Sequence, residues 1–114
     1  TMFEDVYTSS IDVPSFADAL MDLIDVEAAG LLNLASRDVY SKRAFIEALA
    51  QRFGLSLENA CAGSVRELAT PRGESLGLSM AKAEKLLGRR LPSLSDVVEN
   101  LVAQAAERET KYAV

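Results

Sequence analysis

The chain has 114 residues, of which 49% are hydrophobic and 25% are charged, which is the composition of one folded domain covering residues 1–114. Its formal net charge of −5 argues against non-specific binding to nucleic acid or to an anionic membrane, and no apolar run is long enough to span a bilayer. There is no histidine, which is the commonest general base and metal ligand, so we expect no metal site. The single cysteine, Cys61, cannot form an internal disulfide, so we expect a cytoplasmic protein. From the charge and the lack of a long apolar run, we expect no nucleic-acid partner and no membrane partner.

The first thirty residues predict an extended segment followed by one helix. Residues 1–10 are polar with two scattered aromatic side chains, a pattern that favours an extended backbone. Pro14 follows, and its fixed φ suits the first turn of a helix that runs to about Asp25. The predicted apolar face of this helix consists of Phe16, Ala17, Leu20, Leu23 and Ile24.

The stretch from Gly30 to Leu55 predicts a strand, a polar turn and an amphipathic helix. The apolar run over residues 31–35 fits a short strand that is buried on both faces. Ser41 is suited to cap the helix, and Gly54 is suited to end it because glycine enters the left-handed conformation without a Cβ penalty. The predicted apolar face of the helix consists of Phe45, Ile46, Leu49 and Phe53.

The second half of the chain predicts two weak extended pieces and a short helix. We expect a weak strand over residues 60–65, where Cys61 would be a buried, inert thiol. A Pro/Gly/Arg loop and a short extended piece around residues 76–78 follow it. Ser79 is suited to cap the next helix, and Gly88 ends it.

The last helix begins after Pro92. Ser93 and Asp96 have the spacing of a capping box, and the tail from Glu107 is expected to fray. The predicted buried stripe of this helix consists of Val97, Val98, Leu101, Val102 and Ala105. The whole chain therefore predicts a mixed α/β fold that is dominated by four helices, with two or three short strands.

Several short motifs occur in the order and spacing of one enzyme family. A family segment of the form R-S-P-I-x-V-x-D-L-A is matched at Ser9, Ile11, Val13 and Ala17. The pair Ser41-Lys42 then opens a helix that ends in Phe53-Gly54-Leu55, as in the family. Further on, the family elements R-P, K-A-E-x-L-L-G and L-P-S-L are matched by Arg72, Lys82–Gly88 and Leu91–Leu94. Nearly the whole chain thereby resembles the C-terminal, substrate-binding part of extended short-chain dehydrogenases/reductases. Within that family it is most similar to dTDP-4-dehydrorhamnose reductases and nucleotide-sugar epimerases.

The chain departs from this family pattern at several positions. Gly73 replaces a loop proline, Ser79 replaces a helix-capping aspartate, and Ser15 stands where the family usually has an acid. The residues near Thr8 to Ser10 are small and hydroxylic, where the family often has an arginine or an aromatic residue.

The resemblance implies a nucleotide-sugar-binding part that is not catalytic on its own. Such enzymes use NAD(P)H bound to a Rossmann domain with a glycine-rich turn, and a Tyr-x-x-x-Lys pair transfers the proton. Here Tyr7 is followed four residues later by Ile11, and Tyr40 by Ala44, and no glycine-rich turn is present. We expect no cofactor site and no catalytic residue in these residues, and we expect a Rossmann domain on the same protein or on a partner.

Four residues are candidates for contact with a nucleotide sugar. Arg72 is the strongest, because a loop guanidinium can bind a diphosphate through paired charge-assisted hydrogen bonds and because its family position agrees. The weaker candidates are Thr8, Ser10 and Ser36. Ser41 is interpreted as a helix cap and not as a ligand.

Two other interpretations remain open. The first is a non-catalytic module that keeps the fold and serves in protein–protein interaction. The second is a helix-turn-helix DNA-binding protein, in which the helix ending near residue 56 is followed by a second helix over residues 57–65. The second is disfavoured because Ser56 to Gly63 contains no Lys, Arg or Gln to read base edges.

Overall fold

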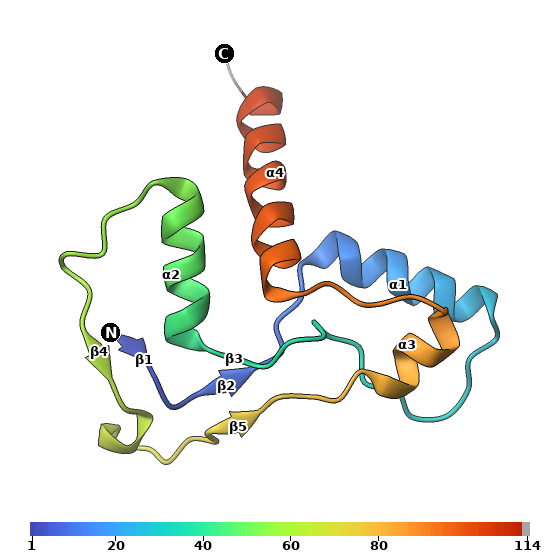
Figure 1. Cartoon of the computed structure of the whole chain (residues 1–114), viewed down its shortest axis with the longest axis horizontal. Helices are drawn as coiled ribbons and strands as arrows, with labels where there is room; N and C mark the ends of the chain where they lie inside the picture. Colours follow the sequence, from blue (N-terminus) through green and yellow to red (C-terminus); the bar gives the residue numbers. More distant parts are fainter. Residues whose placement is uncertain (113–114) are drawn as a thin grey trace.

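The computed structural model describes residues 1–112, which form four α-helices and two small sheets (Figure 1). The helices are α1 (Val13–Asp25), α2 (Lys42–Phe53), α3 (Ala81–Leu87) and α4 (Leu94–Tyr112). The predicted mixed, helix-dominated α/β class is therefore confirmed.

The strands are two residues long and join segments that are far apart in the sequence. β1 (Met2–Phe3) pairs in parallel with β4 (Ala62–Gly63). β2 (Tyr7–Thr8) is the central strand of the second sheet, antiparallel to β3 (Tyr40–Ser41) and parallel to β5 (Ser75–Leu76). The extended segment predicted for residues 1–10 thus contributes one strand to each sheet, and it holds the N-terminus against the middle of the chain.

Helix α1 begins with a side-chain cap that also ties it to α4. Asp12 accepts a hydrogen bond from the N–H of Ser15 at 3.1 Å, as an N-cap residue does, and Pro14 lies in the first turn as expected. The side-chain amides of Asn100 and Gln104 on α4 donate to the same buried carboxylate at 3.2 and 3.4 Å. The N-terminus of α1 is therefore fixed against the side of α4.

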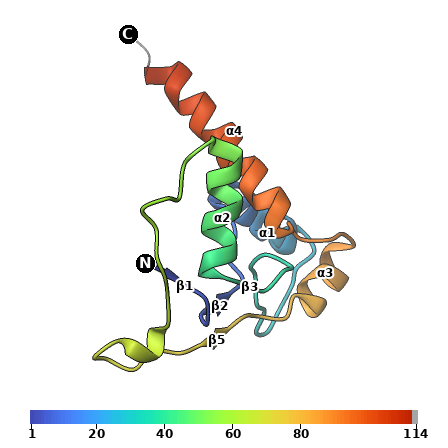
Figure 2. The same cartoon turned by 60° about the vertical axis from the view of Figure 1, so that its left-hand side comes forward.

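The main core lies between α1, α3 and the segment before β3. Its buried residues are Ala19, Ala35, Met80, Ala83 and Leu91. Small side chains on facing sides of α1 and α3 allow the two helices to lie close together. On α4, Val97 and Val98 are buried, and this helix packs on α2 (Figure 2).

The apolar face predicted for α1 is only partly covered by the rest of the described chain. Leu23 is buried as expected, together with Ala19, which was not on the predicted face. Phe16, Leu20 and Ile24 are exposed, because α1 packs on α3 through one edge of its broad apolar arc. A contiguous apolar surface is left along the helix.

The strand predicted over residues 31–35 is wrong, because this segment is irregular. A strand needs a partner strand beside it, and the described sheets place none there. Its backbone groups instead bind unrelated side chains: the Ala35 N–H donates to Met80 Sδ at 3.1 Å, and Lys82 Nζ donates to the Leu31 carbonyl at 2.9 Å. Leu31 itself is 88% exposed, so an apolar run was not evidence of burial here.

Helix α2 confirms both predicted boundaries. Ser41 Oγ accepts a hydrogen bond from the N–H of Ala44 at 3.1 Å. Gly54 adopts the left-handed conformation with φ of 65°, and its N–H bonds the carbonyl of Ala50.

Helix α3 ends as predicted at Gly88, whose φ is 67°, but the predicted cap is wrong. The helix begins at Ala81, so Met80 and not Ser79 occupies the cap position, and no side-chain cap bond forms. Met80 is drawn into the core, where its sulfur accepts the Ala35 N–H. That contact fixes the start of the helix one residue later than the serine requires.

Helix α4 begins with the predicted capping box. Ser93 Oγ accepts the Asp96 N–H at 3.1 Å, and the Asp96 carboxylate accepts the Ser93 N–H at 3.0 Å. The prediction that the chain frays from Glu107 is wrong for residues 107–112, which are helical and extend α4 beyond the body of the molecule (Figures 1 and 2). Most of these residues are good helix formers. The rest of the predicted tail, residues 113–114, lies outside the described residues.

The weak strand predicted over residues 60–65 is reduced to β4, and it is followed by a 3-10 turn over Val65–Glu67. Cys61 is exposed, which corrects the prediction of a buried thiol, because its segment runs along one edge of a two-stranded sheet. The second helix required by a helix-turn-helix is not found in residues 57–65, so that interpretation is wrong.

Candidate functional site

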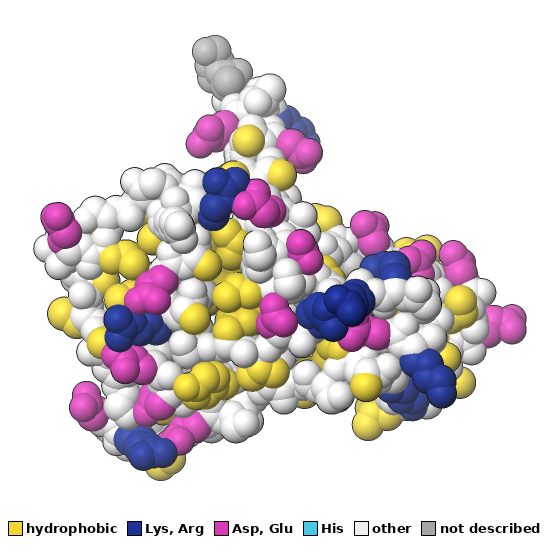
Figure 3. All heavy atoms as spheres, in the orientation of Figure 1, with side chains coloured by type: hydrophobic (Ala, Val, Ile, Leu, Met, Phe, Trp, Pro, Cys, Tyr) yellow, Lys and Arg dark blue, Asp and Glu magenta, His cyan; other side chains and the backbone are white. Residues whose placement is uncertain are grey.

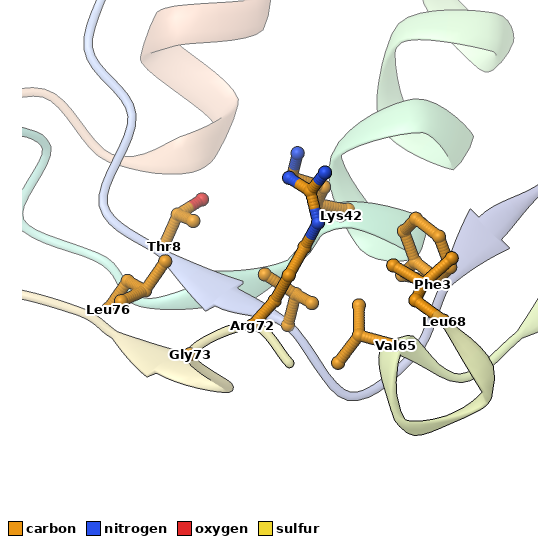
Figure 4. Close-up of a pocket in the computed structure, with 9 residues that line it drawn as sticks. Phe3, Thr8, Lys42, Val65, Leu68, Arg72, Gly73 and Leu76 are labelled. Atoms are coloured by element: carbon orange, nitrogen blue, oxygen red, sulfur yellow. The ribbon is translucent and has the colours of Figure 1, made fainter. Parts of the chain in front are cut away.

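A cleft of about 600 Å³ opens beside the three-stranded sheet (Figure 4). Its walls come from the strands β1, β2 and β5, from the first turn of α2, from the 3-10 turn and from the loop before β5. The lining residues are Phe3, Val6, Thr8, Lys42, Val65, Leu68, Arg72, Gly73 and Leu76. Residues from six separate segments therefore meet at one place.

The floor of the cleft is apolar and held in place by backbone contacts. Val6 and Val65 are 4% and 3% exposed, and Phe3 and Leu68 lie beside Val65 in the view of Figure 4. The Val6 carbonyl accepts the N–H of Lys42 at 3.0 Å, which joins the start of α2 to the floor.

Asp5 fixes the 3-10 turn against the strand segment. Its carboxylate accepts the hydroxyl of Ser64 and, at 3.0 Å, the N–H of Val65. The Ser64 hydrogen bond and then the Val65 hydrogen bond lower the pKa of Asp5. Asp5 therefore stays ionised at neutral pH and holds one wall of the cleft in position.

Two cationic side chains line the cleft above this floor. Lys42 is the first residue of α2, and Arg72 lies in the exposed loop before β5. In Figure 4 both side chains extend over the same side of the cleft. Within residues 1–112, neither has a carboxylate within ion-pair distance.

The neighbouring arginines differ in this respect, because carboxylates neutralise them. Arg66 forms a two-point pair with Glu74, with N···O distances of 2.6 and 2.8 Å, and this pair lowers the pKa of Glu74. Arg43 pairs with Glu4 at 2.6 Å and with Glu47 at 2.7 Å. The positive charge available to a ligand in this region is therefore that of the two cleft residues.

The cleft contains two of the four candidate residues. Arg72 and Thr8 both line it, and the Thr8 hydroxyl shares a hydrogen bond of 3.3 Å with the Ser10 hydroxyl just outside it. The Ser10 carbonyl accepts the hydroxyl of Tyr40 at 2.6 Å, which anchors this segment. Ser36 lies elsewhere: it is fully buried, and its hydroxyl donates to the carbonyl of Asp38 at 2.9 Å.

Sequence reasoning missed Lys42 and the apolar floor. Lys42 belongs to the helix-opening pair Ser41-Lys42, and its place directly after the Ser41 cap is the signal in the sequence that points to it. The floor residues Phe3, Val65 and Leu68 gave no signal, since strands of two residues have no readable periodicity.

The arrangement is suited to binding an anion. The ionisable side chains that line the cleft are Lys42 and Arg72, and both are cations. At the described strand that leads directly into a helix, the connecting residues are Tyr40-Ser41-Lys42 and include no glycine.

Two further features concern ligands and membranes. Over residues 1–112, no group of three His, Cys, Asp or Glu side chains is placed to hold a metal ion. None of the helices in this part of the chain is both long enough and apolar enough to cross a membrane.

Comparison with known proteins gives a structural likeness and no match in sequence. No protein-family model and no curated protein matches the chain. Among solved structures, the chain is similar to a crystal structure of UDP-galactose 4-epimerase, with a TM-score of 0.55 and 17% sequence identity over 87% of this chain. The fold resembles part of a nucleotide-sugar epimerase. The match covers 34% of the epimerase chain, so the sequence given spans about a third of that protein's length.

Proposed function

We propose that this chain is the nucleotide-sugar-binding portion of an NAD(P)-dependent extended short-chain dehydrogenase/reductase, similar to dTDP-4-dehydrorhamnose reductases or sugar epimerases. The observation that carries the proposal is the pair Arg72 and Lys42, two cations without carboxylate partners in the described chain, over one apolar cleft. The structural likeness to part of an epimerase supports it.

The cleft matches the chemistry of a sugar nucleotide in three respects. The Arg72 guanidinium offers a planar fork that suits the oxygens of a diphosphate, and the Lys42 ammonium adds a second positive charge. Thr8 supplies a hydroxyl, and the apolar floor suits the flat face of a nucleobase. A volume of about 600 Å³ lies within the usual range of small-molecule sites.

In this proposal the chain binds substrate and does not catalyse the reaction alone. Hydride transfer and proton transfer belong to a dinucleotide-binding domain on the same polypeptide or on a partner. The cleft residues orient the sugar nucleotide and hold its diphosphate. The exposed apolar surface of α1 is then where that domain packs, since Phe16, Leu20 and Ile24 are left uncovered by the described chain.

The same apolar surface favours a second candidate function, a non-catalytic protein-interaction module. A groove of about 460 Å³ runs along α1, and its lining residues are Phe16, Leu20, Leu23, Ile24, Ala28, Leu32, Asn33, Leu34 and Leu78. A module of this kind would keep the groove and would not need the two unpaired cations in the cleft. Binding of a sugar nucleotide therefore separates the two candidates.

Calorimetric titration of the chain with UDP-galactose and dTDP-glucose tests the proposed function. We expect saturable binding that Arg72→Gln weakens by about tenfold, because the change removes charge-assisted hydrogen bonds to the diphosphate. Arg108→Gln is the matched control, since it removes the same charge from an exposed position near the end of α4, and it should leave the affinity unchanged.

Galactose without a nucleotide should give no heat of binding. Equal affinities in Arg72→Gln and Arg108→Gln would contradict the proposed site. Absence of binding to every sugar nucleotide tested would favour the interaction module.

A further inference from the structure

A second cationic pocket lies at the connection between α3 and α4, away from the cleft. It has a volume of about 510 Å³, and three arginines line it: Arg37 from the segment before β3, and Arg89 and Arg90 from the residues just after α3. Ser93, Asp96 and Asn100 of the α4 region add polar and acidic side chains to the lining. Figure 3 shows Lys and Arg side chains gathered over this connection. We call it the three-arginine pocket.

The two segments that carry these arginines are fixed to each other by hydrogen bonds. The Arg37 N–H donates to the Pro92 carbonyl at 2.9 Å. The Leu94 N–H donates to the Asp38 carboxylate at 2.8 Å, and the Leu91 N–H donates to the Glu84 carboxylate at 2.9 Å. The backbone around the pocket is therefore arranged before any ligand arrives, which lowers the entropic cost of binding.

The carboxylates near the pocket are occupied by backbone N–H groups. Asp38 and Glu84 accept the amides just described, and Asp96 accepts the N–H of Ser93 at 3.0 Å. These contacts are the ones a carboxylate makes at a helix start or in a loop, and they fix the position of each carboxylate, which keeps its negative charge.

The arginines themselves are only partly paired. Arg89 bonds Asp22 at 2.9 Å, whereas the Arg37 Nε lies 3.8 Å from Glu84, beyond hydrogen-bond distance. Arg90 is exposed and has no carboxylate within ion-pair distance in residues 1–112. Among the residues that line the pocket, three arginines therefore stand beside one carboxylate, that of Asp96.

We propose that the three-arginine pocket binds a phosphate group, either free or as a monoester of a small molecule. Guanidinium forks match phosphate oxygens in geometry and charge, and the Ser93 hydroxyl can donate a further hydrogen bond. The pocket borders the first turn of α4, where the helix dipole adds positive potential. Its lining has no aromatic ring to stack on a base, so a phosphate group fits better than a nucleoside.

The proposal does not depend on the sugar-nucleotide cleft. The cleft and the three-arginine pocket share no lining residue, so either can fail without the other. Titration followed by ¹⁵N–¹H NMR tests the pocket directly, because it reports backbone amides and arginine Nε–H groups one at a time. Inorganic phosphate and glycerol 3-phosphate are titrated in separate arms, with sodium acetate at equal ionic strength as the reference.

We expect saturable shifts of the Leu91, Ser93 and Leu94 amides and of the Arg37 and Arg90 Nε–H groups at millimolar phosphate, and none with acetate. Tighter binding of glycerol 3-phosphate would identify a monoester as the ligand, and equal or tighter binding of inorganic phosphate would identify the free ion.

Two variants of exposed residues decide whether the pocket is the site. Arg90→Gln should weaken phosphate binding by about tenfold, whereas Arg72→Gln, which removes the same charge from the cleft, should leave these shifts unchanged. Shifts that grow without saturating, or an equal loss of affinity in both variants, would overturn the proposal.

Discussion

Among single residues, the cations that matter for binding are those that the chain leaves without a carboxylate. Arg66 and Arg43 are paired with Glu74, Glu4 and Glu47, whereas Arg72 and Lys42 face the cleft unpaired. Arg72 could be selected from the sequence because of its loop and its family position. Lys42 could not, because nothing in the sequence shows that its side chain lines the same cleft as Arg72.

Gly54 offers a test of a single backbone conformation. Its φ is 65°, and a Cβ added there would meet no atom within 4 Å, so any cost of substitution comes from the backbone alone. Gly54→Ala should lower the free energy of unfolding by about 1 kcal/mol, because alanine disfavours the left-handed region. Gly54→Asn should lower it less, because asparagine tolerates that region.

Urea denaturation of the two Gly54 variants measures both effects. A Gly54→Asn variant that is no more stable than Gly54→Ala would contradict the conformational explanation.

At the scale of the elements, caps and stops could be predicted from the sequence wherever local hydrogen bonds decide them. The Ser41 cap, the Gly54 and Gly88 stops and the Ser93 capping box are all confirmed. The Ser79 cap failed because a tertiary contact, that of Met80 with Ala35, decides where α3 starts. The same limit applies to the strand predicted over residues 31–35, since pairing depends on partners distant in the sequence.

The capping box of α4 predicts a pH dependence of stability. The hydrogen bond from the Ser93 N–H is the main cause that lowers the pKa of Asp96 in the folded chain. Because the pKa of Asp96 is lower in the folded than in the unfolded chain, the ionised carboxylate stabilises the fold at pH values above the unfolded pKa of about 3.9. This stabilisation is lost as the pH falls through the folded pKa. Asp96→Asn should therefore be less stable than the parent chain at pH 7, by about 0.5 kcal/mol, and the difference should shrink at lower pH.

Urea denaturation at several pH values between neutrality and acid measures the effect of Asp96→Asn. Glu58→Gln, an exposed loop change, is the control and should not follow this profile. A constant difference between Asp96→Asn and the parent chain at all pH values would contradict the assignment.

For the molecule as a whole, the exposed apolar side of α1 is as informative as the cleft. Sequence reasoning predicted its apolar face, and the structure shows that the described chain covers only part of it. The periodicity of a helix reports that a face is apolar and does not report what covers it. Under the proposed function, this surface is where the dinucleotide-binding domain packs.

The central claim is that the cleft holds a sugar nucleotide, and mapping bound UDP-galactose by ¹⁵N–¹H NMR tests it most directly. The account predicts saturable shifts of the Thr8, Lys42 and Gly73 amides and of the Arg72 Nε–H. The signals of the three-arginine pocket should not shift, because UDP-galactose carries no phosphate monoester. Shifts confined to the α3–α4 connection, or no shift at millimolar UDP-galactose, would contradict it.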